Sequence, residues 1–167
     1  MGCGNGWLAA RLSDIEHSTV TGLDINLTEL NQAKAVFTKD NLHFVYDTLR
    51  EGIFPDRQFD VVVFAACLPY FPSLHILDSL FPMLAPEGEI HILDTPFYKP
   101  EEVAGARERM KAYYAAMGIP EMGACYYHHS TEDLKKFKPR LLYDPRSFFN
   151  RLMKRPYPFP WIVIRLL

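Results

Sequence analysis

The sequence predicts an α/β fold with a doubly wound, mostly parallel sheet, and three observations support this prediction. Short apolar segments alternate with helix-forming segments, which favours parallel strands joined by helices. The chain opens on a glycine-rich turn, Gly2-Cys3-Gly4-Asn5-Gly6, that leads directly into a helix-forming segment. An apolar segment, Val20–Asp24, then ends in an acid 18 positions after the last of these glycines. A glycine turn and an acid at this spacing are typical of the nucleotide-cofactor site of doubly wound folds.

The glycine turn marks a place where a small ligand can approach the backbone closely. Glycine has no Cβ and adopts positive φ angles at little cost. The helix expected over Trp7–Leu12 directs its free N–H groups and its dipole toward the turn, which stabilises an anionic group by about 0.3–1 kcal/mol at an exposed site. A flexible glycine-rich terminus without a ligand is the alternative interpretation.

Strands and helices continue to alternate beyond this turn. Strands are expected over Val20–Asp24 and Leu42–Tyr46, and the helix between them begins at Asn26, with Glu29 three positions later as in a capping box. The predicted buried face of this helix comprises Leu30, Ala33 and Phe37. The continuous apolar segment Asp60–Ala65 indicates a strand that is covered on both faces.

A third helix and a fourth strand are expected before residue 95. The helix covers Ser73–Leu84, and Pro86 and Gly88 should end it. Its predicted buried face comprises Leu74, Leu77, Phe81 and Leu84. The strand covers Glu89–Asp94 and again ends in an acid.

The pattern changes after Pro96. A helix should begin at Pro100 and end before Gly118, with one stripe that is more typical of a core than of a pocket. That stripe comprises Val103, Ala106, Met110, Tyr113 and Met117. The remaining predicted elements are a short helix from Ser130 to Phe137, a strand over Leu141–Tyr143, a helix from Asp144 to about Lys154, and a last strand over Trp161–Leu166.

Several of these segments together resemble one family, the class I S-adenosylmethionine (SAM) dependent methyltransferases of the methyltransferase type 11 kind. The glycine turn resembles motif I, and Leu23-Asp24-Ile25 resembles the second-strand acid with its neighbours. Residues 58–68 resemble the fourth strand, and residues 84–94 resemble the L-x-P-G-G turn and the fifth strand. Glu87 departs from the family pattern, because it occupies the position of the first glycine of that turn.

The resemblance implies a Rossmann-like methyltransferase fold with an antiparallel last strand and with SAM as cofactor. It places the glycine turn against the methionine part of SAM, Asp24 at the ribose hydroxyls, Ile25 on the adenine face and Asp47 near the adenine amino group. The cofactor-binding residues it implies are Gly2, Cys3, Gly4, Gly6, Asp24, Ile25, Asp47, Thr48 and Ala65. Asp47 is equally compatible with an ordinary strand-end or capping acid.

The spacing of the glycines argues against a dinucleotide cofactor. A dinucleotide fingerprint, G-x-G-x-x-G/A, ends in a small residue that allows the helix to approach the strand. In this chain Trp7 follows the turn, and its side chain is too large for that role. The G-x-G-x-G spacing matches the methyltransferase turn instead.

The expected reaction is an in-line displacement that transfers the methyl group of SAM to a small-molecule acceptor. Much of the catalysis is then alignment, and a base is needed only if the acceptor loses a proton. Weak catalytic candidates are Tyr70, His128 and His129, and adjacent histidines in a regular element face opposite ways, which argues against a metal site. The resemblance assigns residues 96–129, rich in Tyr and Met, to an acceptor lid that suits an apolar or aromatic molecule.

Composition agrees with a cytoplasmic single domain over residues 1–167. The formal net charge of −2 gives no indication of a nucleic-acid or membrane partner. The three cysteines are odd in number and far apart, and without a C-x-x-C motif they indicate neither disulfides nor a zinc site. The sequence shows no signal peptide and no apolar segment of membrane-spanning length.

The resemblance also raises the question of where the domain starts. The family has an apolar strand directly before the glycine turn, and this strand lies in the middle of the sheet. We therefore expect that Met1 is not the natural start and that the domain is incomplete at its N-terminus, with the first strand missing. An inactive or truncated SAM-binding or interaction protein of the same fold is the alternative to an active enzyme.

Overall fold

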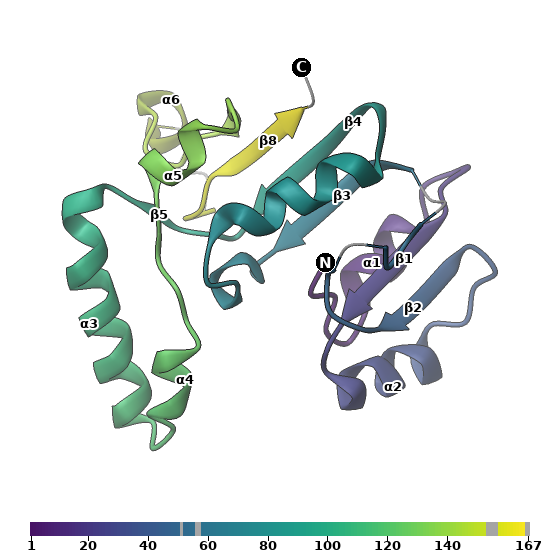
Figure 1. The fold of residues 1–167 in the computed structure, drawn as a ribbon, viewed down its shortest axis with the longest axis horizontal. Helices are drawn as coiled ribbons and strands as arrows, with labels where there is room; N and C mark the ends of the chain where they lie inside the picture. The colour runs from purple at the N-terminus through teal and green to yellow at the C-terminus, as the bar shows by residue number, and fades with distance from the viewer. Residues whose placement is uncertain (51, 56–57, 153–156, 166–167) are drawn as a thin grey trace. The chain divides into compact units, whose positions relative to one another are not determined.

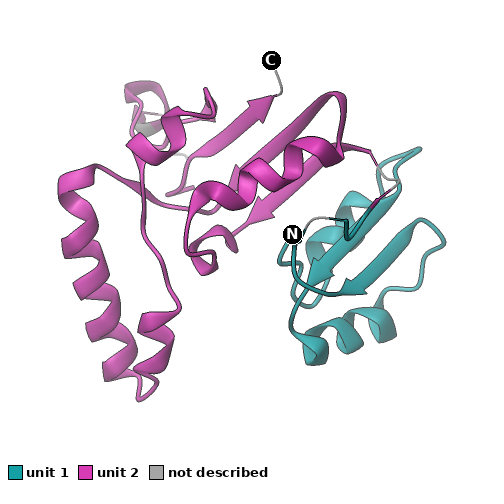
Figure 2. Cartoon of the chain, in the orientation of Figure 1, with its two compact units in different colours: residues 1–54 teal, residues 55–167 magenta. Residues whose placement is uncertain are grey.

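The chain divides into two units, Met1–Phe54 and Pro55–Leu167 (Figure 2). The computed structural model describes residues 1–50, 52–55, 58–152 and 157–165. Each unit contains parallel strands together with helices, so the predicted α/β class is confirmed (Figure 1).

The first unit has a helix–strand–helix–strand order that matches the sequence-based prediction. Its elements are α1 (Trp7–Leu12), β1 (Val20–Asp24), α2 (Leu27–Val36) and β2 (Leu42–Tyr46). The two strands are parallel, with Val20 opposite Leu42 and Asp24 opposite Tyr46. The carboxyl ends of β1 and β2 therefore lie at the same edge of this small sheet.

Helix α2 has the predicted Asn26 cap, as one half of the predicted capping box, and two of the three predicted buried residues. The Asn26 side chain accepts a hydrogen bond from the Glu29 backbone N–H, which satisfies a donor that the first turn would otherwise leave without a partner. Leu30 and Ala33 are fully buried. Phe37 follows the helix end and is half-buried, so it packs from the connecting segment rather than from the helix.

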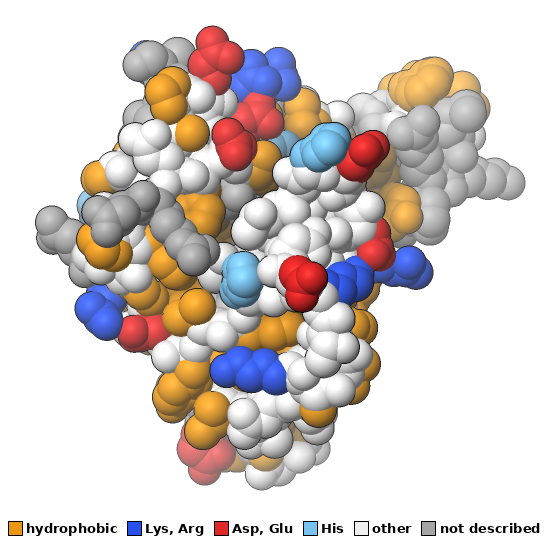
Figure 3. Space-filling model, turned by 90° about the vertical axis from the view of Figure 1, so that its right-hand side faces the viewer, with side chains coloured by type: hydrophobic (Ala, Val, Ile, Leu, Met, Phe, Trp, Pro, Cys, Tyr) orange, Lys and Arg blue, Asp and Glu red, His pale blue; other side chains and the backbone are white. Residues whose placement is uncertain are grey.

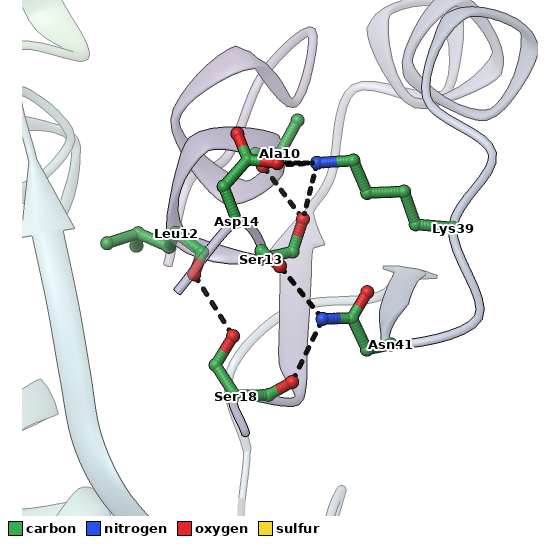
Figure 4. A network of polar contacts seen from close by, with 7 residues as sticks. All are labelled: Ala10, Leu12, Ser13, Asp14, Ser18, Lys39 and Asn41. Atoms are coloured by element: carbon green, nitrogen blue, oxygen red, sulfur yellow. Dashed lines mark hydrogen bonds and ion pairs between the residues drawn. The ribbon is translucent and has the colours of Figure 1, made fainter. Parts of the chain in front are cut away.

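A polar network fixes the C-terminal end of α1 (Figure 4). The Lys39 ammonium donates to the Ala10 carbonyl at 2.9 Å, to the Ser13 hydroxyl at 3.1 Å and to the Asp14 carboxylate at 2.5 Å. The Asn41 amide donates to the carbonyls of Ser13 and Ser18, at 2.8 and 3.0 Å. A cation and amide donors here complement the carbonyl groups and the negative dipole end of the helix.

The second unit contains a four-stranded mixed sheet with the order β3-β4-β8-β7. These strands are β3 (Phe59–Ala65), β4 (Leu84–Leu93), β7 (Arg140–Tyr143) and β8 (Trp161–Arg165). Strands β3 and β4 are parallel, whereas β8 is antiparallel to both β4 and β7. The antiparallel last strand is thus confirmed, and its predicted end at Leu166 lies outside the described residues.

The remaining elements of the second unit connect or cover these strands. They are two 3-10 helices, η1 (Leu68–Tyr70) and η2 (Leu74–Met83), a short parallel pair, β5 (Phe97–Tyr98) and β6 (His129–Ser130), and the helices α3 (Pro100–Ala116), α4 (Glu121–Ala124), α5 (Thr131–Lys135) and α6 (Phe148–Leu152). Helix α5 begins after Ser130, as the sequence predicts, and starts with a capping box between Ser130 and Asp133. Helix α6 starts later than predicted, and its expected end at Lys154 lies outside the described residues.

Side chains link β4 to β8 across the sheet. The Trp161 indole N–H donates to Nδ1 of His91 at 2.9 Å, and Nε2 of the same imidazole lies 2.8 Å from the Glu89 carboxylate. Arg165 forms an ion pair with that carboxylate. The hydrogen bond from His91 and then the one from Arg165 hold the pKa of Glu89 below its ordinary value. These contacts favour the observed register, in which Glu89 lies opposite Arg165.

Strand β3 is covered on one face more completely than on the other, so the prediction of cover on both faces is wrong. Val62 and Phe64 are buried, whereas the Val61 side chain, which points to the opposite face, is 51% exposed. An unbroken apolar run thus also occurs in a strand with one partly exposed face. The sequence pattern therefore does not distinguish a strand that is buried on both faces from a strand that is buried on one.

The predicted helix over residues 73–84 is a 3-10 helix, and its buried face differs from the prediction. A 3-10 helix has three residues per turn, so every third side chain lies on the same face. The buried side chains are Leu74, Leu77, Leu80 and Met83. Phe81, which an α-helical period of 3.6 places in the core, is half-buried.

The segment that the sequence predicts as a helix stop is an irregularity at the start of β4. The register with β3 shifts between Phe59 and Val61, opposite the residues that follow Leu84. A Cβ on Gly88 would lie 2.8 Å from the Phe59 carbonyl oxygen, so only glycine fits there. Glu87 has a φ of 64°, in the left-handed region that costs a non-glycine residue free energy.

The apolar stripe predicted as core on α3 is only partly buried, because Val103 and Met110 are half-buried and two other members are exposed. Ala106 is the α3 residue that is buried, whereas Tyr113 and Met117 are 57% and 56% exposed. Helix α3 contacts α4 and the β5–β6 pair, beside which it runs in Figure 1, and these small elements cover little of its surface. The helix starts at Pro100 as predicted.

Replacing Glu87 by glycine should stabilise the protein. The left-handed conformation costs a non-glycine residue about 1–2 kcal/mol, and the added freedom of glycine in the unfolded chain cancels about 0.4–1 kcal/mol of the gain. We expect Glu87→Gly to raise the free energy of unfolding by about 1 kcal/mol in denaturant titrations. Glu87→Ala is the control, because it removes the charge beside Asp60 and Glu89 but keeps the strain. Equal stabilisation by both variants would show that charge, not backbone strain, is responsible.

Replacing Lys39 by methionine should destabilise the first unit. The change removes a charged donor from the Ala10 carbonyl and the Ser13 hydroxyl, and we expect a loss of about 1–2 kcal/mol in the free energy of unfolding. Asp14→Asn, which leaves both of those bonds in place, should have a smaller effect. A loss of equal size in the two variants contradicts this explanation.

Candidate functional site

The glycine turn adopts the backbone conformation that the sequence predicts. Gly2, Gly4 and Gly6 have φ angles of 58°, 51° and 79°, all in the left-handed region. The Gly6 N–H donates to the Cys3 carbonyl at 2.9 Å and so closes the turn, and Gly6 is also the N-cap of α1. The Cys3 N–H donates to the Leu23 carbonyl at 3.2 Å, which attaches the turn to β1.

Asp24 joins the end of β1 to this turn. One carboxylate oxygen accepts from the Gly4 N–H at 2.7 Å, and the other accepts from the Asn26 N–H at 2.8 Å. A carboxylate has about four acceptor positions, so these two bonds leave capacity for two hydroxyl groups of a ligand. The bond to Gly4 connects two features that the sequence analysis treats as separate.

Asp47 lies at the same edge as Asp24, because β1 and β2 are parallel and end together. Its N–H donates to the Asp24 carbonyl at 3.2 Å. Its carboxylate accepts from Arg50 at 2.8 Å and from the Thr48 N–H at 2.8 Å. The bond to Arg50, followed by that to Thr48, holds the pKa of Asp47 below its ordinary value. The Arg50 ion pair is a contact that the sequence analysis missed.

Ile25 and Glu29 complete the surroundings of the turn within the first unit. The Ile25 side chain is 70% exposed directly after Asp24, so an apolar surface lies next to the acid. A Cβ on Gly4 would lie 2.5 Å from the Glu29 carboxylate, which shows that this second acid reaches the turn from α2. Acids around a bare backbone turn suit a ligand that carries hydroxyl groups and positive charge, and they disfavour a pyrophosphate.

Ala65, the last predicted cofactor residue, belongs to the second unit. It is the final residue of β3 and is half-buried. The next residue, Ala66, has a φ of 58° and donates its N–H to the Leu93 carbonyl at 3.1 Å. The strand therefore ends in a sharp turn at this point. A role of Ala65 at a cofactor stays a prediction.

His129, one of the catalytic candidates, is part of the packing between β6 and η1. Its imidazole is buried, and Nε2 lies 3.2 Å from the Leu68 carbonyl, so this nitrogen carries the proton and donates it. Burial lowers the pKa of His129, so the ring is neutral at pH 7. The Tyr127 N–H donates a second hydrogen bond to η1, to the Pro69 carbonyl at 2.7 Å. This environment favours a structural role.

His128 is buried in a different environment and has no polar partner. Its side chain is 8% exposed, and neither ring nitrogen has a hydrogen-bond partner. The ring packs between Tyr98 and Tyr126, with centroid distances of 5.4 and 5.3 Å. Burial, and then the positive charge of Arg107, lower the pKa of His128. A buried donor and a buried acceptor without partners cost about 1–3 kcal/mol each, so this position is not explained by packing alone.

Tyr70, the third candidate, extends the aromatic contacts from His128 toward solvent. Its side chain is 49% exposed and meets Tyr126 edge-to-face at 5.7 Å. Tyr114 lies 6.4 Å from Tyr126 on the α3 side. We call Tyr70, Tyr98, Tyr114 and Tyr126 the tyrosine cluster. The sequence analysis names Tyr70 and His128 but has no signal for Tyr98 or Tyr114, which come from other elements.

In the described ranges of the chain, no group of three or more His, Cys, Asp or Glu side chains is placed to hold a metal ion. None of the helices in those ranges has the length and apolar character that crossing a bilayer requires.

The sequence matches a known family over more than half of the chain. A family model described as a methyltransferase domain matches residues 1–88. The chain belongs to this family, the class I SAM-dependent methyltransferases. Over 130 residues it is 31% identical to the ubiquinone/menaquinone biosynthesis C-methyltransferase UbiE of Vibrio parahaemolyticus serotype O3:K6, and the alignment covers 74% of this chain and 49% of that protein. The chain thus spans about half the length of this curated relative.

Solved structures of methyltransferases share the fold. An S-adenosylmethionine dependent methyltransferase from Mesorhizobium loti superposes with a TM-score of 0.68 and 16% identity, over 99% of this chain and 88% of the other. The plantazolicin methyltransferase BpumL in complex with S-adenosylhomocysteine (SAH) superposes with a TM-score of 0.66 and 15% identity, over 99% and 74% of the two chains. The predicted Rossmann-like methyltransferase fold is confirmed.

Substitutions at two glycines of the turn should have different effects on stability. A Cβ on Gly6 would lie 2.7 Å from the Phe44 ring and 2.8 Å from the Ala33 Cβ, in addition to the backbone strain. We expect Gly6→Ala to lower the free energy of unfolding by about 2–4 kcal/mol. A Cβ on Gly4 meets the flexible end of Glu29, so Gly4→Ala should cost about 1–2 kcal/mol, mostly as strain. Denaturant titration of both variants measures the difference, and equal losses contradict it.

Proposed function

We propose that the protein transfers a methyl group from SAM to a small-molecule acceptor, and that the glycine turn and Asp24 hold the cofactor. The observation that carries the proposal is the Asp24 carboxylate, which is bonded to the Gly4 N–H at 2.7 Å at the end of a parallel strand. Membership of the methyltransferase family and the fold shared with a SAH-bound methyltransferase support it.

The residues of the first unit fit the parts of SAM. Asp24 has acceptor capacity for the ribose hydroxyls, and Gly2, Cys3, Gly4 and Gly6 present backbone to the methionine part. Ile25 offers an exposed apolar side chain for the adenine face. Thr48 and Asp47 follow β2, and Asp47 would have to accept from the adenine amino group while it remains paired with Arg50. Ala65 is proposed to line the reactive end.

The charge around the turn also fits this cofactor. SAM supplies a methyl group on a positively charged sulfur, which is already activated for displacement. The carboxylates of Asp24, Glu29 and Asp47 make the end of β1 and β2 favourable for a positive charge. A cofactor with a pyrophosphate group would instead need donors or cations where these acids lie.

Positioning is the main contribution that this chain makes to the reaction. The bonds of Asp24 to Gly4 and Asn26 fix the carboxylate before a ligand arrives, and a fixed acceptor loses little conformational freedom on binding. Alignment of two reactants on a fixed surface is an established source of rate acceleration. A base is needed only for an acceptor that must lose a proton.

A small-molecule acceptor is supported by two observations. The curated relative is a C-methyltransferase of ubiquinone and menaquinone biosynthesis. The formal net charge is −2, and on the face shown in Figure 3 the Lys and Arg side chains lie among acidic, apolar and polar groups, whereas surfaces that bind nucleic acid are typically basic.

Isothermal titration calorimetry with SAH tests the cofactor assignment. Asp24→Asn should weaken SAH binding about 10- to 100-fold, because hydrogen bonds to a charged group contribute about 1.5–3 kcal/mol. Asp40→Asn is the matched control, since Asp40 is an exposed acid outside the turn and should leave the affinity unchanged. Unchanged affinity in Asp24→Asn contradicts the assignment. Normal SAH binding without methylation of any phenol, carboxylate or amine acceptor supports the alternative of an inactive SAM-binding protein.

A further inference from the structure

The environment of His128 indicates a second binding site, within the second unit. Both imidazole nitrogens of His128 are buried without a hydrogen-bond partner. Aromatic rings flank this side chain, and an apolar side chain could pack against them equally well. A buried polar group without a partner is rare in proteins and calls for an explanation, such as a missing ligand. Nothing in the packing of β5 and β6 requires an imidazole at this position.

We propose that Tyr98, Tyr126 and His128 form the binding site for an aromatic compound that carries an acidic hydroxyl group, with the His128 imidazole as the hydrogen-bond acceptor for that hydroxyl. The existence of this binding site does not depend on the proposed function. The identification of its ligand as the methyl acceptor rests on that function.

The aromatic character of the ligand follows from the tyrosine cluster. Tyr98 and Tyr126 flank His128 with interplanar angles of 53° and 59°, and Tyr70 meets Tyr126 at 82°. Tilted and edge-to-face rings offer the contacts that a planar aromatic molecule prefers. Tyr70, which is half exposed, connects this group of rings with solvent, so a ligand can enter by moving the Tyr70 and Tyr126 side chains.

The acidic hydroxyl follows from the polar groups that face His128. A neutral imidazole has one N–H and one acceptor nitrogen, and burial keeps His128 neutral at pH 7. The other titratable or charged groups that act on it are Arg107 and Arg109 of α3 and the neighbouring His129. The positive charges of Arg107 and Arg109 act on the ring, and they favour a ligand that gains negative charge when its hydroxyl gives up the proton, as a phenol does.

Helix α3 and the segment from α4 to β6 bring these groups together. They run beside each other in Figure 1, and α3 contacts α4, β5 and β6. In the β5–β6 pairing, Tyr98 lies opposite Ser130, and Ser130 follows His128 by two residues. The arginines of α3 thus act on the His128 imidazole by their charge, and the aromatic rings that contact it come from other elements.

Binding of a phenol and of its methyl ether to the 167-residue chain tests the proposal without SAM. The probes are 4-nitrophenol and 4-nitroanisole, which share the ring and nitro group and differ in the hydroxyl. We expect 4-nitrophenol to bind at least tenfold more tightly in calorimetric titrations. His128→Phe should weaken 4-nitrophenol binding at least tenfold and leave 4-nitroanisole binding unchanged. His75→Gln, at an exposed histidine of η2, is the control and should bind both probes as the unaltered protein does.

The stability of the variant separates a binding role from a packing role. His128→Phe keeps a ring in place and removes the two unpartnered nitrogens, so it should raise the melting temperature while it weakens binding. If that variant does not fold, His128→Leu replaces it, because it also removes the acceptor, and the same loss of 4-nitrophenol binding is expected. Equal binding of the two probes, absence of binding, or unchanged 4-nitrophenol binding in the His128 variant overturns the proposal. A parallel SAH titration tests the proposed function independently. Binding of 4-nitrophenol without binding of SAH contradicts the proposed function but not the proposed site at His128.

Discussion

The hydrogen bond between the Gly4 N–H and the Asp24 carboxylate is the constraint on which the candidate cofactor site depends. It spans 20 residues of sequence and joins the turn before α1 to the end of β1. The same carboxylate holds the Asn26 N–H at the start of α2. One side chain thus determines how the turn, the strand and the next helix meet, and the parallel pairing of β1 with β2 adds Asp47 to that edge.

Steric limits around the turn reinforce this constraint. A side chain at Gly6 would enter the space of Phe44 and Ala33, and a side chain at Gly22 would meet Cys3. The glycines are therefore required by close approach inside the first unit as well as by positive φ angles. The turn is therefore packed against Phe44 and Ala33 at Gly6, whereas Gly4 lies beside the flexible carboxylate of Glu29.

The second unit combines a regular sheet with irregular connections. Phe64, Ile90, Ile92 and Ile164 are almost completely buried, and the Trp161–His91–Glu89–Arg165 contacts link β4 to β8. The side chains grouped around His128 lie outside this sheet, on η1, α3, the β5–β6 pair and the segment between α4 and β6. Rigid strands with variable connections are the usual arrangement in which a fold keeps its core and changes its ligand.

The sequence by itself determined the features that depend on neighbouring residues. Positive φ angles in the turn, the bounds of β1 and β2, the Asn26 cap and the Ser130–Asp133 capping box follow from local backbone sterics and short-range hydrogen bonds. Asp24 could be named as a candidate because its distance from the turn is set by one helix and one strand. The sequence also shows that Glu87 occupies a position where the family has glycine, but it does not show that this residue has a strained, positive φ angle.

Only the tertiary structure decided the features that depend on distant residues. The assembly of Tyr98 and Tyr126 around His128, with Tyr114 beside Tyr126, had no reliable signal in the sequence. The same holds for the ion pair of Asp47 with Arg50 and for the exposure of Tyr113 and Met117. The choice of a 3-10 period for η2, which buries Leu80 in place of Phe81, belongs to the same group. Burial and pairing are decided by which surfaces come to lie opposite each other, and a local pattern cannot specify a partner that lies elsewhere in the chain.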